Sequence, residues 1–231
     1  MKLVLFDIDG TLLKLHTPKS KEVFRKTIGS AFSRHVPESA LPSFAGMTDL
    51  LIIRLIAENI GIPEDELYGK INVVEEIICE EFQKIVKPEL IEILPGVKQL
   101  VSLLGNDQGF SLGLLTGNFE RNAYLKVNSI GLGDFFPIGA FGSDRENRNE
   151  LPAIAIRRAN LHHGSELFSE ENCIIIGDSE RDIECGRSNN IPVVAVATGY
   201  KKREELEPLE PDVLLDDFSD VRSTLDILRR I

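Results

Sequence analysis

Three aspartates, Asp7, Asp9 and Asp178, stand at or just beyond the ends of short apolar runs in this sequence. Carboxylates that gather in one place repel one another unless a cation neutralises them, and oxygen ligands are those that Mg²⁺ prefers. A metal ion there would also offset the repulsion between a carboxylate and a phosphoryl oxygen, so that Asp7 could attack phosphorus and form an acyl-phosphate. The residue types therefore predict Mg²⁺-dependent phosphoryl chemistry.

Further polar residues supply other parts of such a site. Asp9, two residues after Asp7, is expected to protonate the leaving oxygen and then, once ionised, to activate a water molecule. Thr116 and the amides near Gly117 and Asn118 follow another apolar run, where a helix is expected to begin. The beginning of a helix favours an anion, so these three residues are predicted to bind phosphate. A positively charged side chain is still required.

Six apolar runs have the form of buried parallel strands that could position these residues. They cover residues 2–6, 110–116, 135–141, 173–178, 192–199 and 213–217. Helical spacing of apolar residues between the runs predicts an α/β fold, a doubly wound parallel sheet with helices on both faces. Ligands bind outside the carboxyl ends of the strands in such sheets, so the polar residues that follow the strands should converge.

One segment, residues 16–92, interrupts the alternation. It carries helical patterns around 20–34, 48–59 and 72–86 and no convincing strand. We therefore expect an all-helical insertion at 16–92 within an α/β core formed by residues 1–15 and 93–231. Residues 44–49 predict a loop and a helix N-cap, with contact to a substrate as the alternative interpretation.

Bulk properties narrow the class of protein. The 231 residues include 42% hydrophobic positions, enough for a sizeable core, and the formal net charge is −11. This charge disfavours a nucleic-acid partner. No run reaches the roughly 18 apolar residues of a membrane span, and the N-terminus lacks the apolar core of a signal peptide. The three cysteines indicate neither a disulfide framework nor a zinc site, which fits a reducing compartment. We therefore expect a cytoplasmic protein with no membrane partner.

The order of the motifs resembles the haloacid dehalogenase superfamily. Its DxDxT signature is matched by residues 7–11, its strand-ending Thr or Ser by Thr116, and its GDxxxD motif by residues 177–182. The helical insertion after the first motif resembles the cap of phosphoglycolate-phosphatase-like members. The resemblance implies a Rossmann-like catalytic core with an all-helical cap domain.

The resemblance also implies a role for each acidic residue. Asp7 would be the nucleophile and Asp9 the general acid/base. Asp7, the backbone carbonyl of Asp9, and Asp178 would hold Mg²⁺, and Asp182 would orient the positive group.

The sequence departs from the family at its third motif. Relatives usually carry a Lys followed by Pro, whereas residues 142–151 contain no Lys. Arg148, just before a predicted helix, stands at the most suitable position, and Arg145 is the competitor. Arginine is always charged and binds carboxylate and phosphate through two bonds, so it can replace the Lys as a catalytic cation.

The expected activity is hydrolysis of a small-molecule phosphate monoester. A β-phosphoglucomutase-like phosphomutase is the first alternative, although family mutases usually depart from the Gly10-Thr11 that follows Asp9 here. A catalytically silent binding protein of the same fold is the second, supported by the missing Lys. Dehalogenase and phosphonatase relatives lack an acid at the position of Asp9. The pattern carries no prediction of the substrate's identity or of the oligomeric state.

Overall fold

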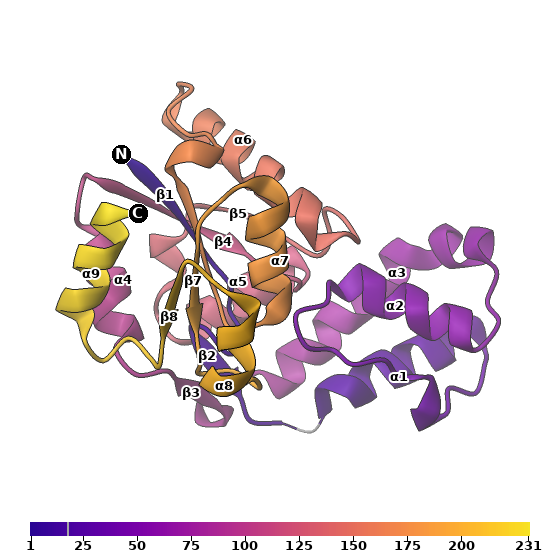
Figure 1. The fold of residues 1–231 in the computed structure, drawn as a ribbon. Coiled ribbons are helices and arrows are strands. Elements are labelled where there is room, and N and C mark those ends of the chain that lie inside the picture. The colour runs from indigo at the N-terminus through magenta and orange to yellow at the C-terminus, as the bar shows by residue number, and fades with distance from the viewer. Residues whose placement is uncertain (18) are drawn as a thin grey trace.

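A parallel sheet of six strands forms the centre of the molecule, in the order β5-β4-β1-β6-β7-β8 (Figure 1). The computed structural model describes residues 1–17 and 19–231; residue 18, within the predicted insertion, lies outside it. The strands are β1 (Lys2–Phe6), β4 (Phe110–Leu115), β5 (Ile138–Ala140), β6 (Cys173–Gly177), β7 (Val193–Val196) and β8 (Val213–Leu215). Each lies within one of the six apolar runs, which confirms the predicted α/β fold.

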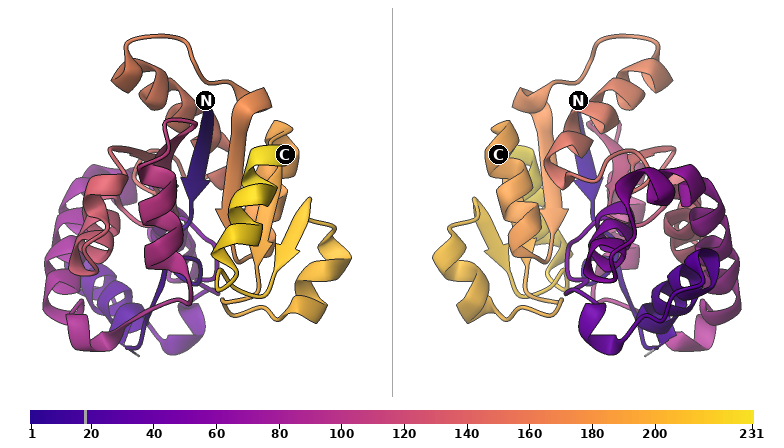
Figure 2. Two further views of the ribbon diagram at one scale, coloured as in Figure 1. Left: turned by 90° about the vertical axis from the view of Figure 1, so that its left-hand side faces the viewer. Right: turned by 90° about the vertical axis from the view of Figure 1, so that its right-hand side faces the viewer.

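Helices cover both faces of this sheet (Figure 2). One face carries α4 (Val97–Gly105), α5 (Glu120–Ser129) and α9 (Val221–Arg230), and the other carries α6 (Leu151–His163), α7 (Glu180–Asn189) and α8 (Arg203–Leu206). In β1, Val4 and Phe6 pack into the first core, whereas Leu3 and Leu5 pack into the second. Because successive side chains of a strand point to opposite faces, a strand covered on both faces is apolar throughout.

Three helices, α1 (Lys19–Phe32), α2 (Asp49–Asn59) and α3 (Glu64–Ile85), form a bundle to one side of the sheet (Figure 1). They bury a third hydrophobic cluster that includes Phe24 and Ile53. The Thr48 side chain accepts a hydrogen bond from the Leu51 amide at 3.2 Å and caps α2, which confirms the predicted loop and N-cap. Short 3₁₀ helices occupy Glu38–Ala40, Pro88–Leu90, Gly133–Phe135, Arg148–Glu150, Glu170–Asn172 and Glu207–Leu209.

A two-stranded antiparallel ribbon joins the core to the helical bundle. It consists of β2 (Leu13–Leu15) and β3 (Ile91–Ile93), with Leu13 opposite Ile93. The sequence interpretation missed both strands, and β3 begins at the edge of the segment in which no strand was expected. The ribbon pairs the chain that enters the bundle with the chain that leaves it. The exact boundary of the predicted insertion stays a prediction.

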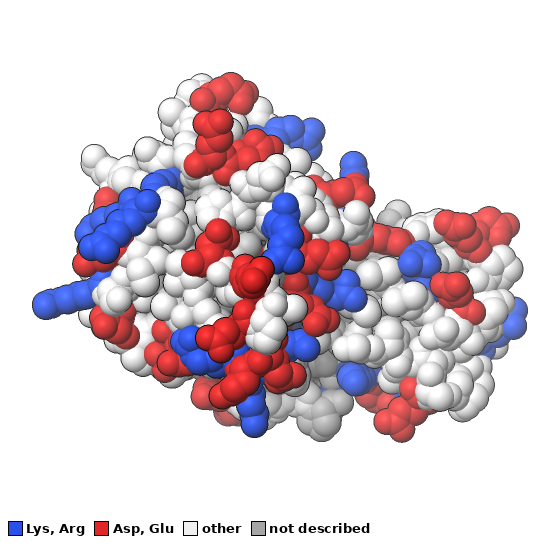
Figure 3. Space-filling view, in the orientation of Figure 1, with Lys and Arg blue, Asp and Glu red and all other residues white. Residues whose placement is uncertain are grey.

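The surface is mixed in charge. On the face seen in Figure 3, acidic and basic side chains are interspersed over both the core and the helical bundle. Among residues 1–17 and 19–231, no helix is long and apolar enough to cross a membrane.

Candidate active site

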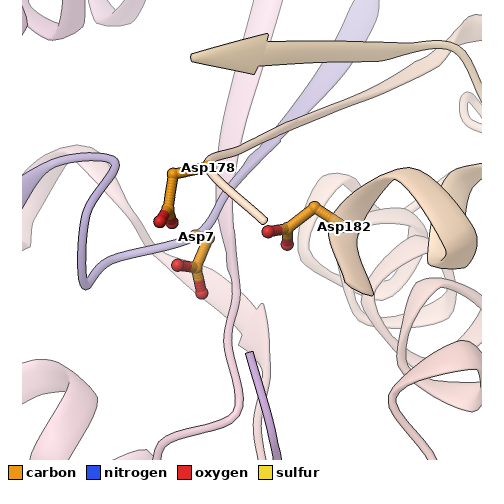
Figure 4. Close-up of side chains that lie close together, drawn as sticks. All are labelled: Asp7, Asp178 and Asp182. Carbon is orange, nitrogen blue, oxygen red and sulfur yellow. The ribbon is translucent and has the colours of Figure 1, made fainter. Parts of the chain in front are cut away.

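Three acidic side chains meet where the central strands end. Asp7 directly follows β1, Asp178 directly follows β6, and Asp182 lies in the first turn of α7 (Figure 4). All three are buried, and one carboxylate oxygen from each lies within 4.8 Å of the others. β1 pairs with both β4 and β6, so their carboxyl ends lie at one edge of the sheet. Convergence at this edge is what the strand pattern predicted for Asp7 and Asp178.

Arg148 is a cation that contacts two of these acids, Asp7 and Asp182. Its Nη2 lies 3.0 Å from Oδ1 of Asp7, 2.5 Å from Oδ1 of Asp182 and 3.1 Å from the Leu115 carbonyl oxygen. The residue is only 5% exposed. The competing Arg145 instead pairs with Glu150 at 3.2 Å on an exposed surface. Of the two arginines, Arg148 is therefore the one that lies against the predicted nucleophile.

Both carboxylate oxygens of Asp182 accept hydrogen bonds from neighbouring residues. Its Oδ1 accepts from Arg148, and its Oδ2 accepts from the amide (3.0 Å) and hydroxyl (2.5 Å) of Ser179. Ser179 in turn caps α7. Because both Asp182 oxygens accept hydrogen bonds, Asp182 is suited to orient Arg148. Arg148 and Thr11 bond to Oδ1 of Asp7 and of Asp178, so the Oδ2 atoms of these two acids, which accept no hydrogen bond from the described residues, are available for a cation.

Burial makes ionisation of these two carboxyls unfavourable. The pKa of Asp7 is raised to about 7, chiefly by burial, although the Arg148 guanidinium opposes the shift. The pKa of Asp178 is raised well above its usual value by burial and by the charges of Asp7 and Asp182. A bound cation would relieve both effects. The Asp9 carbonyl oxygen accepts no hydrogen bond from residues 1–17 or 19–231, so it too is available to a metal ion. Together with the carboxylates of Asp7 and Asp178 it forms an all-oxygen donor set, which fits a hard divalent cation.

A tight turn lets the first motif approach Asp178. Gly10 has φ +94°, a conformation that side chains other than hydrogen disfavour. A Cβ atom at Gly10 would also lie 2.4 Å from Oδ2 of Asp178. The next residue, Thr11, donates its hydroxyl to Oδ1 of Asp178 at 3.3 Å. Gly10 therefore serves both the turn and the close approach of the acid.

The residues after β4 lie between the acidic cluster and the helical bundle. The Thr116 hydroxyl accepts from the amide of Asn118 (3.3 Å) and from its Nδ2 (2.8 Å), which leaves its own hydrogen to donate. Gly117 contacts the bundle, since a Cβ there would lie 2.0 Å from the Met47 carbonyl oxygen. The structure thus brings Thr116, Gly117 and Asn118 to this edge, and phosphate binding by them stays a prediction.

Asp9 is held by Asn118 and by Lys126, a residue that the sequence did not single out. Its Oδ2 lies 2.6 Å from Nζ of Lys126 on α5 and accepts from Nδ2 of Asn118 at 2.8 Å. Lys126 also donates to Oδ1 of Asn118 at 2.7 Å. Asp9 is therefore fixed beside the Asp7 cluster by a buried cation of its own.

The first turn of α2 is bonded to the loop after β4. The Asp49 amide donates to the Gly117 carbonyl oxygen at 2.7 Å, and the Phe119 amide donates to Oδ2 of Asp49 at 2.7 Å. The Thr48 hydroxyl donates to the Glu146 carbonyl oxygen at 2.6 Å. A cavity of about 70 Å³, lined by Thr48 and Arg148 among others, adjoins these bonds. Contact of residues 44–49 with a substrate stays a prediction.

The buried Asp49 gives a test of this contact through pH. Burial raises its pKa to about 7, although the Phe119 amide and Lys126 oppose the shift. A carboxyl that binds its proton more tightly when folded stabilises the protein at low pH, and this contribution is lost as the pH rises through 7. Asp49→Asn keeps an acceptor for the Phe119 amide without titrating. We therefore expect the variant to exceed the wild type in unfolding free energy by roughly 1–3 kcal/mol at pH 8 and by less at pH 5.

Urea unfolding at both pH values measures this difference. Asp65→Asn is the matched control, because Asp65 is an exposed acid in the first turn of α3 and should show little change with pH. An equal effect of Asp49→Asn at pH 5 and pH 8 would contradict the interpretation.

The chain is similar in sequence and in fold to known proteins. A sequence model of the haloacid dehalogenase-like hydrolase family matches residues 1–190. The chain is 23% identical over 228 residues to phosphoglycolate phosphatase of Nitrosococcus oceani, covering 97% of this chain and 96% of that protein. It is 28% identical over 233 residues to the pyrophosphatase PpaX of Bacillus cereus, covering 98% and 97%. The structure of a Clostridium difficile β-phosphoglucomutase has a similar fold, with a TM-score of 0.72, 18% identity, and coverage of 99% and 97%.

Proposed function

Since the chain belongs to the haloacid dehalogenase-like hydrolase family, we propose that it is a Mg²⁺-dependent phosphatase that hydrolyses a small phosphate monoester through an aspartyl-phosphate on Asp7. Its curated relatives include a phosphoglycolate phosphatase and a pyrophosphatase. The observation that carries the proposal is the position of Arg148, buried between Asp7 and Asp182 beside Asp178. The proposed nucleophile, a buried cation and the proposed oxygen ligands thus lie together at one edge of the sheet.

The metal ion would be held by the carboxylates of Asp7 and Asp178 and by the backbone carbonyl of Asp9. When bound, Mg²⁺ supplies positive charge that lowers the repulsion between the attacking carboxylate and the phosphoryl oxygens. Arg148 adds a second positive charge next to Asp7, and Asp182 keeps the Arg148 guanidinium oriented. The hydroxyl of Thr116 and the nearby amides are proposed to donate to the phosphoryl oxygens.

In the first step, an oxygen of Asp7 bonds to phosphorus and the bond from phosphorus to the ester oxygen breaks. The departing oxygen keeps the electron pair and takes a proton from Asp9. In the second step, water attacks the phosphorus of the aspartyl-phosphate and gives a proton to Asp9. The bond between Asp7 and phosphorus then breaks, which releases inorganic phosphate and restores both acids.

A phosphate-release assay tests the proposal. The panel contains phosphoglycolate, pyrophosphate, sugar phosphates and nucleoside monophosphates, each with Mg²⁺ and with excess chelator. We expect release from at least one monoester with Mg²⁺ and a loss of at least about 100-fold on chelation, because the Asp7 and Asp178 carboxylates then repel the substrate. Release that is unaffected by chelation would contradict the metal requirement. Isomerisation of a sugar phosphate without net phosphate release would favour the phosphomutase alternative.

A further inference from the structure

Lys126 buries its ammonium group next to the predicted acid/base. The residue projects from α5 and is only 4% exposed. Its Nζ lies 2.6 Å from Oδ2 of Asp9 and 2.7 Å from Oδ1 of Asn118. Because removing an ammonium group from water is costly unless it is paired, the geometry of this contact is strongly constrained.

Only one of the two carboxylate oxygens of Asp9 accepts hydrogen bonds. Both Lys126 and Nδ2 of Asn118 bond to Oδ2, whereas Oδ1 accepts no hydrogen bond from any residue in the described part of the chain. The Asp9 side chain is 40% exposed, and that of Lys126 is 5% exposed. One oxygen is therefore held against the core while the other remains free. A carboxylic acid in this setting carries its proton on the oxygen that does not accept from the ammonium group.

The helical bundle covers the Lys126 side chain from the other side. Nζ lies 5.7 Å from the ring centroid of Phe82 on α3, and α3 packs against α5. The aromatic ring attracts the cation and excludes water from it. An ion pair shielded in this way is stronger and better fixed than an exposed one.

We propose that Lys126 is a positioning residue for proton transfer in the proposed phosphatase reaction, on which this inference rests. With Asn118 it fixes Oδ2 of Asp9, so Oδ1 is the atom that gives a proton to the leaving oxygen. In the second step the same Oδ1 takes a proton from the attacking water. Lys126 itself neither touches the substrate nor exchanges a proton.

Leaving-group dependence tests this role. A positioned general acid matters most when the leaving group is a poor one, such as an alkoxide, and little for 4-nitrophenolate. For Lys126→Met we expect kcat/KM to fall about 30-fold or more on an alkyl phosphate that the wild type hydrolyses, because general acid catalysis supplies about 10²–10⁴. On 4-nitrophenyl phosphate it should fall less than about threefold. The ratio of the two values is measured in one preparation, so the folded fraction cancels.

Two further variants define the scale. Asp9→Asn removes the acid itself and should shift the same ratio in the same direction by at least as much. Lys84→Met removes a lysine from an exposed pair with Glu81 on α3 and should leave the ratio unchanged. If Lys126→Met does not fold, Lys126→Gln is measured in the same way. An equal loss on both substrates would assign Lys126 a purely structural role and overturn the inference. Absence of wild-type phosphate release would instead overturn the proposed function.

Discussion

Replacing Asp7 by Asn is expected to lower kcat for phosphate release by about 10⁴ or more, since the loss of a nucleophile removes the covalent route. The fold should survive. An amide at this position still offers an oxygen to Arg148, whose Nη2 also contacts Asp182. The variant also removes a carboxylate whose pKa is raised to about 7 by burial, so its unfolding free energy at pH 8 should equal or exceed that of the wild type.

Steady-state phosphate release and acid-quench trapping measure this prediction. Wild-type protein incubated with ³²P-labelled substrate should retain label that hydroxylamine removes, as an acyl-phosphate does, whereas Asp7→Asn should retain none. Asp107→Asn is the control, because Asp107 precedes β4 at the opposite edge of the sheet and pairs with Arg229 at 3.0 Å. Release by Asp7→Asn above about 1% of the wild-type rate would be incompatible with a nucleophilic Asp7.

Much of the core was predictable because most of its strands are buried apolar runs, and β1, β4 and β6 are each followed directly by a polar residue. The strand predicted at 135–141 was too long, because Gly133–Phe135 forms a 3₁₀ turn and β5 begins only at Ile138. The ribbon of β2 and β3 escaped notice because three residues are too few to establish a period of two. Their pairing depends on contacts between residues about 80 positions apart, and the local sequence does not indicate such contacts.

The site divides in the same way. Asp7, Asp178 and Thr116 were found because each directly follows a strand. The sequence favoured Arg148 over Arg145 because it stands just before a predicted helix. What the sequence could not show is its placement: Asn147 caps the short turn Arg148–Glu150, in which Arg148 is buried.

Lys126 gave no usable signal. It lies beside the apolar face of α5, where a lysine is usually solvated, and it meets Asp9 from 117 residues away. Only tertiary packing makes it a buried cation, so no local pattern in the sequence distinguishes it from a surface lysine.

Replacing Arg148 by Met is expected to produce the largest combined loss of stability and activity. The substitution leaves Asp7 and Asp182 buried without their common cation, and removing one partner from a buried ion pair costs about 3–5 kcal/mol. Phosphate release should fall by about 10² or more, because the site loses the positive charge that lies against the attacking carboxylate of Asp7. Arg148→Lys restores one charge but not the simultaneous contacts to both acids, so its loss should be intermediate in both measurements.

The stability defect of Arg148→Met should depend on pH in a defined direction. Without the guanidinium, the pKa of Asp7 rises further above its unfolded value, so the folded variant binds protons more tightly than the unfolded chain. Its stability therefore increases as the pH falls, and urea unfolding should find a smaller defect at pH 5 than at pH 8. Arg145→Met, which breaks only an exposed pair with Glu150, should cost less than about 1 kcal/mol at either pH. Equal and pH-independent costs for the two arginines would show that Arg148 does not compensate the buried acids, and would remove the central support for a phosphoryl-transfer site at this edge of the sheet.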